Sequence, residues 1–214
     1  MVKIKWFGHA CIAVIRSDNY TIVFDPHDGY SIGLRKPDVV ADLILVSHDH
    51  FDHNAVKSVS KKESRVLKEF FGEVTVDNVV VKGFKTYHDK DGGRKRGLNA
   101  VYLVETEGFR IAHMGDLGDT PEPKVIDSIR NVDILFIPVG GVYTVEPIEA
   151  AEIVDKVKPK NVMPIHYWIS GLRLPLREVG DFLNYVKGFD IVKLDTNEFL
   201  LEQYSGKLIV AKYV

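Results

Sequence analysis

The stretch Ser47-His48-Asp49-His50-Phe51-Asp52-His53 places three imidazoles and two carboxylates within seven residues. It follows the apolar run Leu43-Ile44-Leu45-Val46, which predicts a buried strand. A strand that ends in a dense cluster of nitrogen and oxygen donors suits a transition-metal site. The strand fixes the backbone, and the loop turns several donors toward one point.

The spacing within this stretch predicts two sets of ligands. His48 and His50 are two residues apart, so they project from one face while the chain stays extended. Asp52 and His53 are adjacent and cannot share that face unless the chain bends. We therefore expect two metals side by side, about 4 Å apart if they share a bridging ligand. The alternatives are a single-metal site and a polar loop in which the histidines cluster by chance.

Composition sets the class of protein. The length of 214 residues, with 45% hydrophobic and 27% charged residues, fits one globular domain over residues 1–214. The net charge of −2 gives no overall attraction to nucleic acid or acidic membranes. No apolar run approaches the roughly 20 residues that cross a bilayer. With one cysteine, Cys11, and no signal peptide pattern, we expect a cytoplasmic protein without disulfides.

The first half of the chain is rich in predicted strands, and the second half alternates helices and strands. We expect strands at residues 3–7, 11–16, 20–24, 39–46, 73–76, 79–87, 100–105, 110–113, 133–137, 161–165, 191–194, 198–202 and 207–211. We expect a short helix from about Ala55, capped by Asn54, and helices at 123–130, 147–157 and 176–186. This order predicts an α+β fold with two packed sheets and helices outside.

The motif from His48 to His53 matches the HxHxDH signature of metallo-β-lactamase-fold hydrolases. Other motifs agree in order: Trp6-Phe7-Gly8-His9-Ala10, Phe24-Asp25-Pro26, Tyr87-His88-Asp89, His113-Met114-Gly115-Asp116-Leu117-Gly118, Pro138-Val139-Gly140-Gly141 and Met163-Pro164-Ile165-His166-Tyr167. The chain resembles the branch of ascorbate-6-phosphate lactonase-like proteins and uncharacterised Zn-dependent hydrolases. The resemblance implies an αββα sandwich of two mixed sheets, with the metals at one edge of the sheets.

Three further donors follow predicted strands or glycine: His88, Asp116 and His166. The resemblance implies that His88 completes a three-histidine set, that Asp116 bridges two cations, and that His166 joins the second set. The alternatives are a surface histidine, a helix N-cap and a satisfied core histidine, respectively. The expected metal ligands are His48, His50, Asp52, His53, His88, Asp116 and His166. A His/Asp set suits several divalent metals, so zinc is expected first, with Mn, Fe or Ni as alternatives.

Other residues are candidates for supporting the ligands or contacting substrate: His9, Asp25, Arg96, His113 and Tyr143. His9 is open between a metal ligand, a donor behind the ligands and a substrate contact. Asp25 is expected to orient the metal loop, and His113 to have a structural or supporting role. The basic run at 94–96 is either a solvated face or a glycine-hinged, flexible flap beside the metals, where Arg96 would contact an anionic group. Tyr143 is expected at the rim.

These residues predict hydrolysis of a C–O, C–N or P–O bond by a metal-bound hydroxide, with Asp52, His53 and Asp116 as candidate catalytic residues. We expect a metal-dependent hydrolase of a small ester, lactone or phosphate-bearing substrate, with no membrane partner. A nucleic-acid-processing phosphodiesterase or RNA-binding protein of the same fold is the alternative, although the chain lacks a basic balance. A redox di-iron protein is a further alternative. The oligomeric state stays open.

Overall fold

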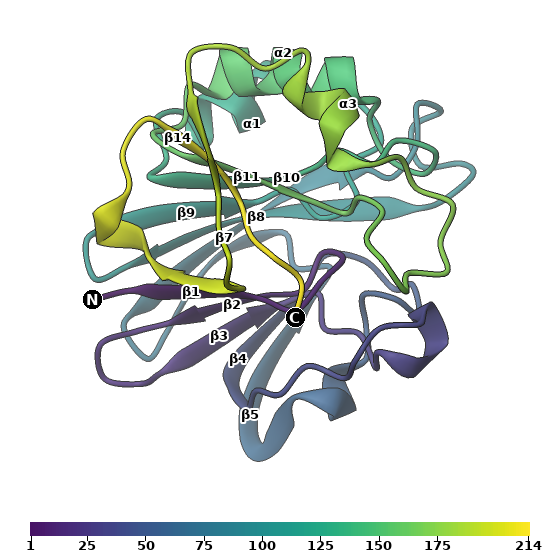
Figure 1. The fold of residues 1–214 in the computed structure, drawn as a ribbon. Helices are drawn as coiled ribbons and strands as arrows, with labels where there is room; N and C mark the ends of the chain where they lie inside the picture. Colours follow the sequence, from purple (N-terminus) through teal and green to yellow (C-terminus); the bar gives the residue numbers. More distant parts are fainter.

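The computed structural model describes residues 1–214, whose strands form two mixed sheets packed face to face (Figure 1). The smaller sheet contains β1 (Lys3–Trp6), β2 (Ile12–Ile15), β3 (Thr21–Phe24), β4 (Ala41–Val46), β5 (Ser60–Lys68) and β13 (Glu198–Leu200). The larger sheet contains β6 (Gly72–Val76), β7 (Val79–Tyr87), β8 (Leu98–Thr106), β9 (Phe109–His113), β10 (Ile134–Pro138), β11 (Val162–Ile165), β12 (Asp190–Lys193) and β14 (Lys207–Val210). The predicted α+β class with two packed mixed sheets is confirmed.

The strand orders explain why several loops meet at one edge. The smaller sheet runs β13-β1-β2-β3-β4-β5, and the larger runs β12-β14-β11-β10-β9-β8-β7-β6. β3 and β4 are parallel, as are β9, β10 and β11, whereas β7, β8 and β9 alternate in direction. The carboxyl ends of β1, β3 and β4 therefore lie at one edge of the smaller sheet. Those of β7, β9, β10 and β11 lie at one edge of the larger sheet. The connecting loops gather on the right in Figure 1.

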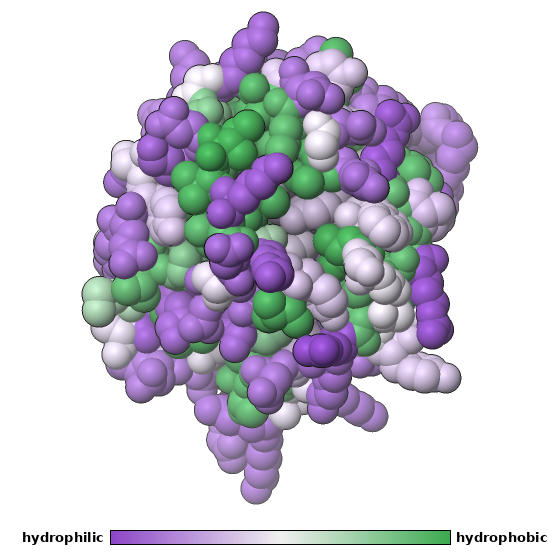
Figure 2. Space-filling view, in the orientation of Figure 1, coloured by the Kyte–Doolittle hydropathy of each residue, from purple (hydrophilic) through white to green (hydrophobic).

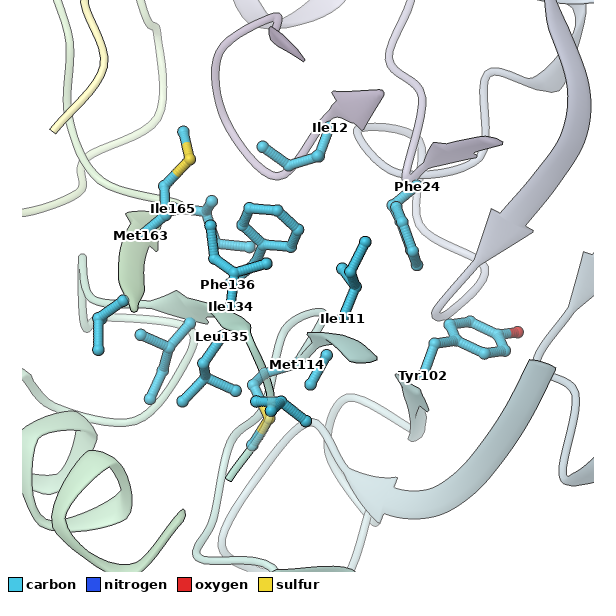
Figure 3. Packing of buried hydrophobic residues seen from close by; sticks show 14 of the residues in the cluster. Ile12, Phe24, Tyr102, Ile111, Met114, Ile134, Leu135, Phe136, Met163 and Ile165 are labelled. Atoms are coloured by element: carbon cyan, nitrogen blue, oxygen red, sulfur yellow. The ribbon is translucent and has the colours of Figure 1, made fainter. Parts of the chain in front are cut away.

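The main core lies between the sheets. Successive strand residues alternate between faces, so Ile111 and Phe136 point inward while Leu135 points to the opposite face. In Figure 3, Ile12 and Phe24 of the smaller sheet face Ile111 and Phe136 of the larger one. The rings of Phe24 and His113 stack with their centroids 4.8 Å apart. The hydrophobic core therefore extends to the polar residues at the ends of β3 and β9.

The three α-helices lie over the larger sheet (Figure 1): α1 (Pro123–Ser128), α2 (Pro147–Val157) and α3 (Val179–Leu183). Pro147 opens α2, where the Glu146 amide donates to the Glu149 side chain at 2.8 Å, and Lys158 ends it with φ 52°. The side chains that α2 buries recur at helical spacing: Pro147, Ala150, Ala151, Ile153, Val154 and Val157. Figure 2 shows apolar side chains among hydrophilic ones in the upper left part of the same view.

The outer face of the smaller sheet is covered by irregular chain. A separate cluster there includes Cys11, Val23 and Ile44, with Val59 from the segment around the 3-10 turn η2 (Val56–Ser58). The expected helix from Ala55 is therefore wrong: only this short turn forms, and the Asn54 side chain donates to Asp49 instead of capping a helix. Two further 3-10 turns are η1 (Tyr30–Ile32) and η3 (Leu201–Gln203). No helix of the structure is long and apolar enough to cross a membrane.

Candidate metal centre

The loop after β4 is anchored by one buried carboxylate. Asp25, at the end of β3, accepts from the Ser47 amide at 2.7 Å through Oδ1 and from the Ser47 hydroxyl at 2.7 Å through Oδ2. Asp25 itself has φ 43°, a conformation that aspartate tolerates better than most residues. The structure thus places Asp25 directly beneath the metal loop, where its hydrogen bonds orient the start of the His48–His53 motif.

The same hydrogen bonds set the tautomers of two histidines. Asp25 Oδ2 lies 3.1 Å from His53 Nδ1, and an ionised carboxylate can only accept, so this nitrogen carries the hydrogen. The Ser47 hydroxyl donates to Asp25 and therefore accepts from His48 Nδ1, 2.9 Å away. Both Nε2 atoms keep free lone pairs for a metal, the usual arrangement in histidine-ligated sites.

Two groups of donors converge beside this loop. His48, His50 and His88 form one group, and His9, Asp52, His53 and His166 form the other; within each, the donor atoms lie within 4.8 Å of one another. In the second group, His9 Nε2 lies 3.1 Å from both Asp52 Oδ2 and His53 Nε2. Two ligands of one tetrahedral ion bound at about 2.0–2.2 Å would lie roughly 3.3–3.6 Å apart. The observed separations are close to that range.

Asp116 lies between the two groups. Its Oδ2 is 3.1 Å from His166 Nε2, 3.2 Å from His53 Nε2, 3.4 Å from His88 Nε2 and 3.8 Å from His48 Nε2. One carboxylate therefore approaches donors of both groups. This position fits the bridging role that the family resemblance implies.

The Asp116 loop is held by Gly115 and Asn99. Gly115 has φ +56°, and a Cβ there would overlap Asn99 Oδ1 and Ser47. Asn99 Oδ1 accepts from the Asp116 amide at 2.9 Å, and its Nδ2 donates to Met114 O and Thr86 Oγ1, each at 2.9 Å. Asn99 is completely buried, so it acts as a rigid link between β8 and the loop after β9.

Buried polar atoms without partners show that the donors fit a metal. Among the buried atoms with no hydrogen-bond partner are His48 Nε2, Asp116 Oδ1 and His166 Nε2. A buried polar atom left unpaired costs about 1–3 kcal/mol, and native proteins hold few of them. A bound metal ion would give several such atoms, gathered in one small cluster of imidazole and carboxylate donors, the partners that they lack.

Burial and mutual charge perturb the pKa values of the cluster. Burial lowers the pKa of His48 and of His9 to about 3, and that of His88 to about 4. Burial alone would raise the pKa of Asp116, but the charges of His166 and His53 hold it well below its ordinary value. Burial alone would lower the pKa of His53, but the charges of Asp116 and Asp52 outweigh it and raise that pKa well above its ordinary value. At neutral pH the imidazoles of His9, His48 and His88 are thus neutral, and the Asp116 carboxylate is ionised. These are the protonation states that metal binding requires.

The structure distinguishes the roles of the histidines outside the set of expected ligands. His9, with φ 53°, joins the second donor group, and its carbonyl accepts from the His166 amide at 3.1 Å. His113 has both ring nitrogens engaged: Nε2 donates to Ala10 O at 2.9 Å and Nδ1 accepts from the Gly115 amide at 3.1 Å. His27 is buried and donates to Phe7 O at 3.0 Å. His113 therefore supports the Asp116 loop from behind.

A cleft of about 330 Å³ opens onto the donors. It is lined by His50, Phe51, Asp52, His88, Arg96, Asp116, Tyr143 and Leu174. The Arg96 guanidinium carbon lies 4.4 Å from the centroid of the Tyr143 ring. Phe51, which is 62% exposed, supplies an aromatic wall of this cleft. The cleft therefore combines charged, aromatic and aliphatic walls at small-molecule size.

The basic run at 94–96 is held more firmly than its glycines predicted. Asp89 Oδ1 accepts from the amides of Asp91 and Gly93 at 2.8 and 2.9 Å, and Oδ2 from those of Lys95 and Arg96 at 2.9 and 2.7 Å. Burial opposes ionisation, but the four backbone hydrogen bonds lower the pKa of Asp89 to about 2. The sequence left a solvated face and a flexible flap as alternatives, and the structure shows a loop beside the donors that is organised around one carboxylate.

Three supporting residues were assigned no role from sequence: Ser47, Asp89 and Asn99. Ser47 and Asp89 are immediate neighbours of predicted ligands, so their adjacency to His48 and His88 was an available signal. Asn99 lies 17 residues before Asp116 and acts through a contact that only the pairing of β8 with β9 creates. No local pattern distinguishes it from an ordinary loop asparagine.

Comparisons with known proteins place the chain in a family. A family model described as the β-lactamase superfamily domain matches residues 3–166. A protein of Thermococcus kodakarensis named UPF0173 metal-dependent hydrolase is 30% identical, over 78% of this chain and 85% of that protein. A similar protein of Thermococcus onnurineus is 29% identical over the same shares.

Solved structures show the same fold. A candidate Zn-dependent hydrolase of the metallo-β-lactamase superfamily from Thermotoga maritima is 36% identical, with a TM-score of 0.78 over 99% of this chain and 98% of that one. A metal-dependent hydrolase from Parabacteroides distasonis, 19% identical, has a TM-score of 0.72 and supports the fold alone. Together with the donor cluster, these likenesses show that the chain belongs to the metallo-β-lactamase superfamily and is one of its metal-dependent hydrolases.

Proposed function

We propose that the enzyme holds two divalent cations, zinc first among the candidates, and hydrolyses a small ester, lactone or phosphate-bearing substrate. The observation that carries the proposal is Asp116, whose Oδ2 lies within 3.8 Å of an Nε2 from both donor groups. His48, His50 and His88 would hold one cation, and Asp52, His53, His166 and His9 the other. When bound, the metals supply Lewis-acid polarisation of the substrate and a hydrolytic water near neutral pH.

The side chains around the donors supply positioning and shielding. Asp52 and Asp116 are ionised because burial, which raises their pKa values, is outweighed by neighbouring imidazoles. Both carboxylates line the cleft, so Asp52 and Asp116 are the side chains placed to exchange a proton with substrate. Phe51 and Leu174 form apolar walls that keep bulk water from the reacting bond.

The cleft volume favours a small molecule over a polymer. At about 330 Å³ it matches the lower range of small-ligand sites, and the chain carries no net positive charge. The single cysteine, Cys11, is completely buried, which suits a reducing compartment such as the cytoplasm. A small organic ester, lactone or phosphate ester is therefore the proposed substrate.

Metal content and hydrolysis together test this function. Wild-type protein loaded with zinc should hold about two equivalents and lose hydrolysis after chelation. His48→Ala and His53→Ala, one from each donor group, should each lose metal. The matched control is Asp49→Ala, because Asp49 lies in the same motif but faces solvent and pairs with Lys68 at 2.7 Å.

Substrate class is tested on the same metal-defined protein with neutral esters, lactones, phosphate monoesters and diesters, and RNA. Hydrolysis of an ester, lactone or phosphate ester that disappears in both histidine variants supports the proposal. Unchanged metal content in both variants, or activity on RNA alone, would contradict it.

A further inference from the structure

We propose that Arg96 recognises an oxyanion group on the substrate, remote from the bond that is hydrolysed. This inference rests on the proposed function, since it specifies the substrate class of the same cleft. Its structural basis is a guanidinium group that lines the cleft with Asp52, His88 and Asp116 while making no ion pair and no side-chain hydrogen bond within the protein.

Arg96 is distinct from the other cations of its loop. Lys90 pairs with Glu149 of α2, and Lys95 pairs with Asp91 at 2.5 Å. Arg94, which is exposed like Arg96, does not line the cleft. Arg96 is therefore the one cation of this loop that faces the donors without a partner of its own. If the basic run were only a solvated surface, Arg96 would not differ from Arg94 and Lys95 in this way.

Two contacts hold Arg96 in place without using the N–H groups of its guanidinium. The Tyr143 ring lies under the guanidinium at 4.4 Å, a cation–π geometry that fixes the position of the charge. The Arg96 amide donates to Asp89 Oδ2 at 2.7 Å, which fixes the backbone from which the side chain extends. Guanidinium N–H groups that stay free on a held arginine suit bidentate binding of a carboxylate or phosphate.

The charge balance of the cleft favours the same class of ligand. Asp52 and Asp116 are the two carboxylates that line it, and Arg96 opposes them. Each divalent cation held by the donor groups would add two positive charges, so the loaded cleft is electropositive. Phe51 and Leu174 add apolar surface between these charges. The inferred substrate is small, carries a carboxylate or phosphate at one end and has a short apolar body.

Equilibrium binding to zinc-loaded protein tests the inference independently of turnover. Butyrate carries one carboxylate, whereas succinate, glutarate and adipate carry a second at increasing distance. Wild type should bind the best of these diacids about ten- to a hundred-fold more tightly than butyrate, the range of one charge-assisted contact. Arg96→Ala should remove that preference, and Arg96→Lys should keep part of it. The matched control Arg94→Ala should leave it unchanged.

Kinetics supply the second readout. Mono(4-nitrophenyl) glutarate and 4-nitrophenyl phosphonoacetate carry a carboxylate and a phosphonate, and 4-nitrophenyl acetate carries neither. Arg96→Ala should raise KM for the two anionic esters far more than for the neutral ester, with little change in kcat. A larger effect on one of the two anionic esters shows whether Arg96 prefers a carboxylate or a phosphate-type anion.

The outcomes separate this inference from the proposed function. Equal binding of butyrate and every diacid by wild type, or an unchanged preference in Arg96→Ala, would overturn the role of Arg96 even if all esters are hydrolysed. Conversely, an Arg96-dependent diacid preference in a protein that hydrolyses none of the esters would support anion recognition and count against ester hydrolysis.

Discussion

At the scale of single residues, Asp116 connects the two donor groups, and its charge is the feature most open to test. We expect Asp116→Asn to fold normally but to lose about 2–4 kcal/mol of transition-state stabilisation, because a neutral amide cannot balance two cations as a carboxylate does. The measurement is kcat/KM on the best substrate, with the urea midpoint as a check on folding.

The control for this substitution is Asp49→Asn, which removes a carboxylate from the motif at an exposed position paired with Lys68. It should retain wild-type kcat/KM. If Asp116→Asn stays within a few-fold of wild type, Asp116 does not bridge the metals. A parallel loss of the urea midpoint would instead mark a folding defect, so the two measurements are read together.

Donor residues could be predicted from sequence because ligand chemistry restricts residue type. All seven predicted ligands lie in the two donor groups or, for Asp116, between them. His9 could not be assigned because its approach to Asp52 depends on a left-handed backbone at φ 53°. A positive φ is uncommon for residues other than glycine, so no periodic pattern predicts it. Arg96 could be selected as a candidate, but its stacking on Tyr143 joins residues 47 positions apart.

At the scale of elements, the loop from Asp89 to Gly97 is a unit built on one side chain. Four backbone amides donate hydrogen bonds to Asp89, so the backbone that carries Arg96 has little freedom to move. Asp89 is therefore a positioning residue for Arg96, and its effect should appear on anionic substrates selectively.

We expect Asp89→Asn to raise KM for an anionic ester about three- to thirty-fold, because the amide nitrogen would face two backbone N–H groups and loosen the loop. The values of kcat and of KM for a neutral ester should change little. Since Asp89 adjoins His88, metal content is measured in the same samples. Equal losses on both esters at full metal content would show that Asp89 serves general stability only.

Elements with strong periodicity were predicted closely, whereas an edge strand was missed. α2 begins and ends where its apolar spacing and Pro147 indicate. β5 was not predicted, because Leu67 is its one buried residue and charged side chains dominate the rest. Such charges are typical of edge strands, which avoid pairing with other chains. α3 is also shorter at both ends than the predicted helix at 176–186: its first turn is loop next to the cleft residue Leu174, and it ends at Leu183.

At the scale of the whole molecule, the site joins the two sheets and links stability to pH. His9 and His53 come from the smaller sheet and His88 and His166 from the larger one, so the donor cluster closes one edge of the sandwich. Folding forces several of these imidazoles into a buried, neutral state. The metal-stripped protein should therefore depend on pH in a window set by the histidines.

The direction follows from the pKa values. Burial lowers the pKa of His9 and His48 from 6.5 to about 3, and of His88 to about 4. Below pH 6.5 the unfolded chain binds protons that these folded histidines do not, so the free energy of unfolding falls as the pH drops toward 4. The raised pKa of His53 opposes this only above 6.5, and the lowered pKa values of Asp52 and Asp116 act only below about 4.

We expect the urea midpoint of metal-stripped protein to decrease from pH 7 to pH 4.5. Below pH 6.5 the free energy of unfolding should fall by about 1.4 kcal/mol per pH unit for each histidine that stays neutral in the fold. Zinc-loaded protein should start higher at pH 7, and its advantage should shrink as protons compete with the metal for the donors of the folded protein. A midpoint independent of pH across this window would mean that the cluster accepts protons when folded. The histidines would then not be held neutral, and ready for a metal, by the packing of the two sheets.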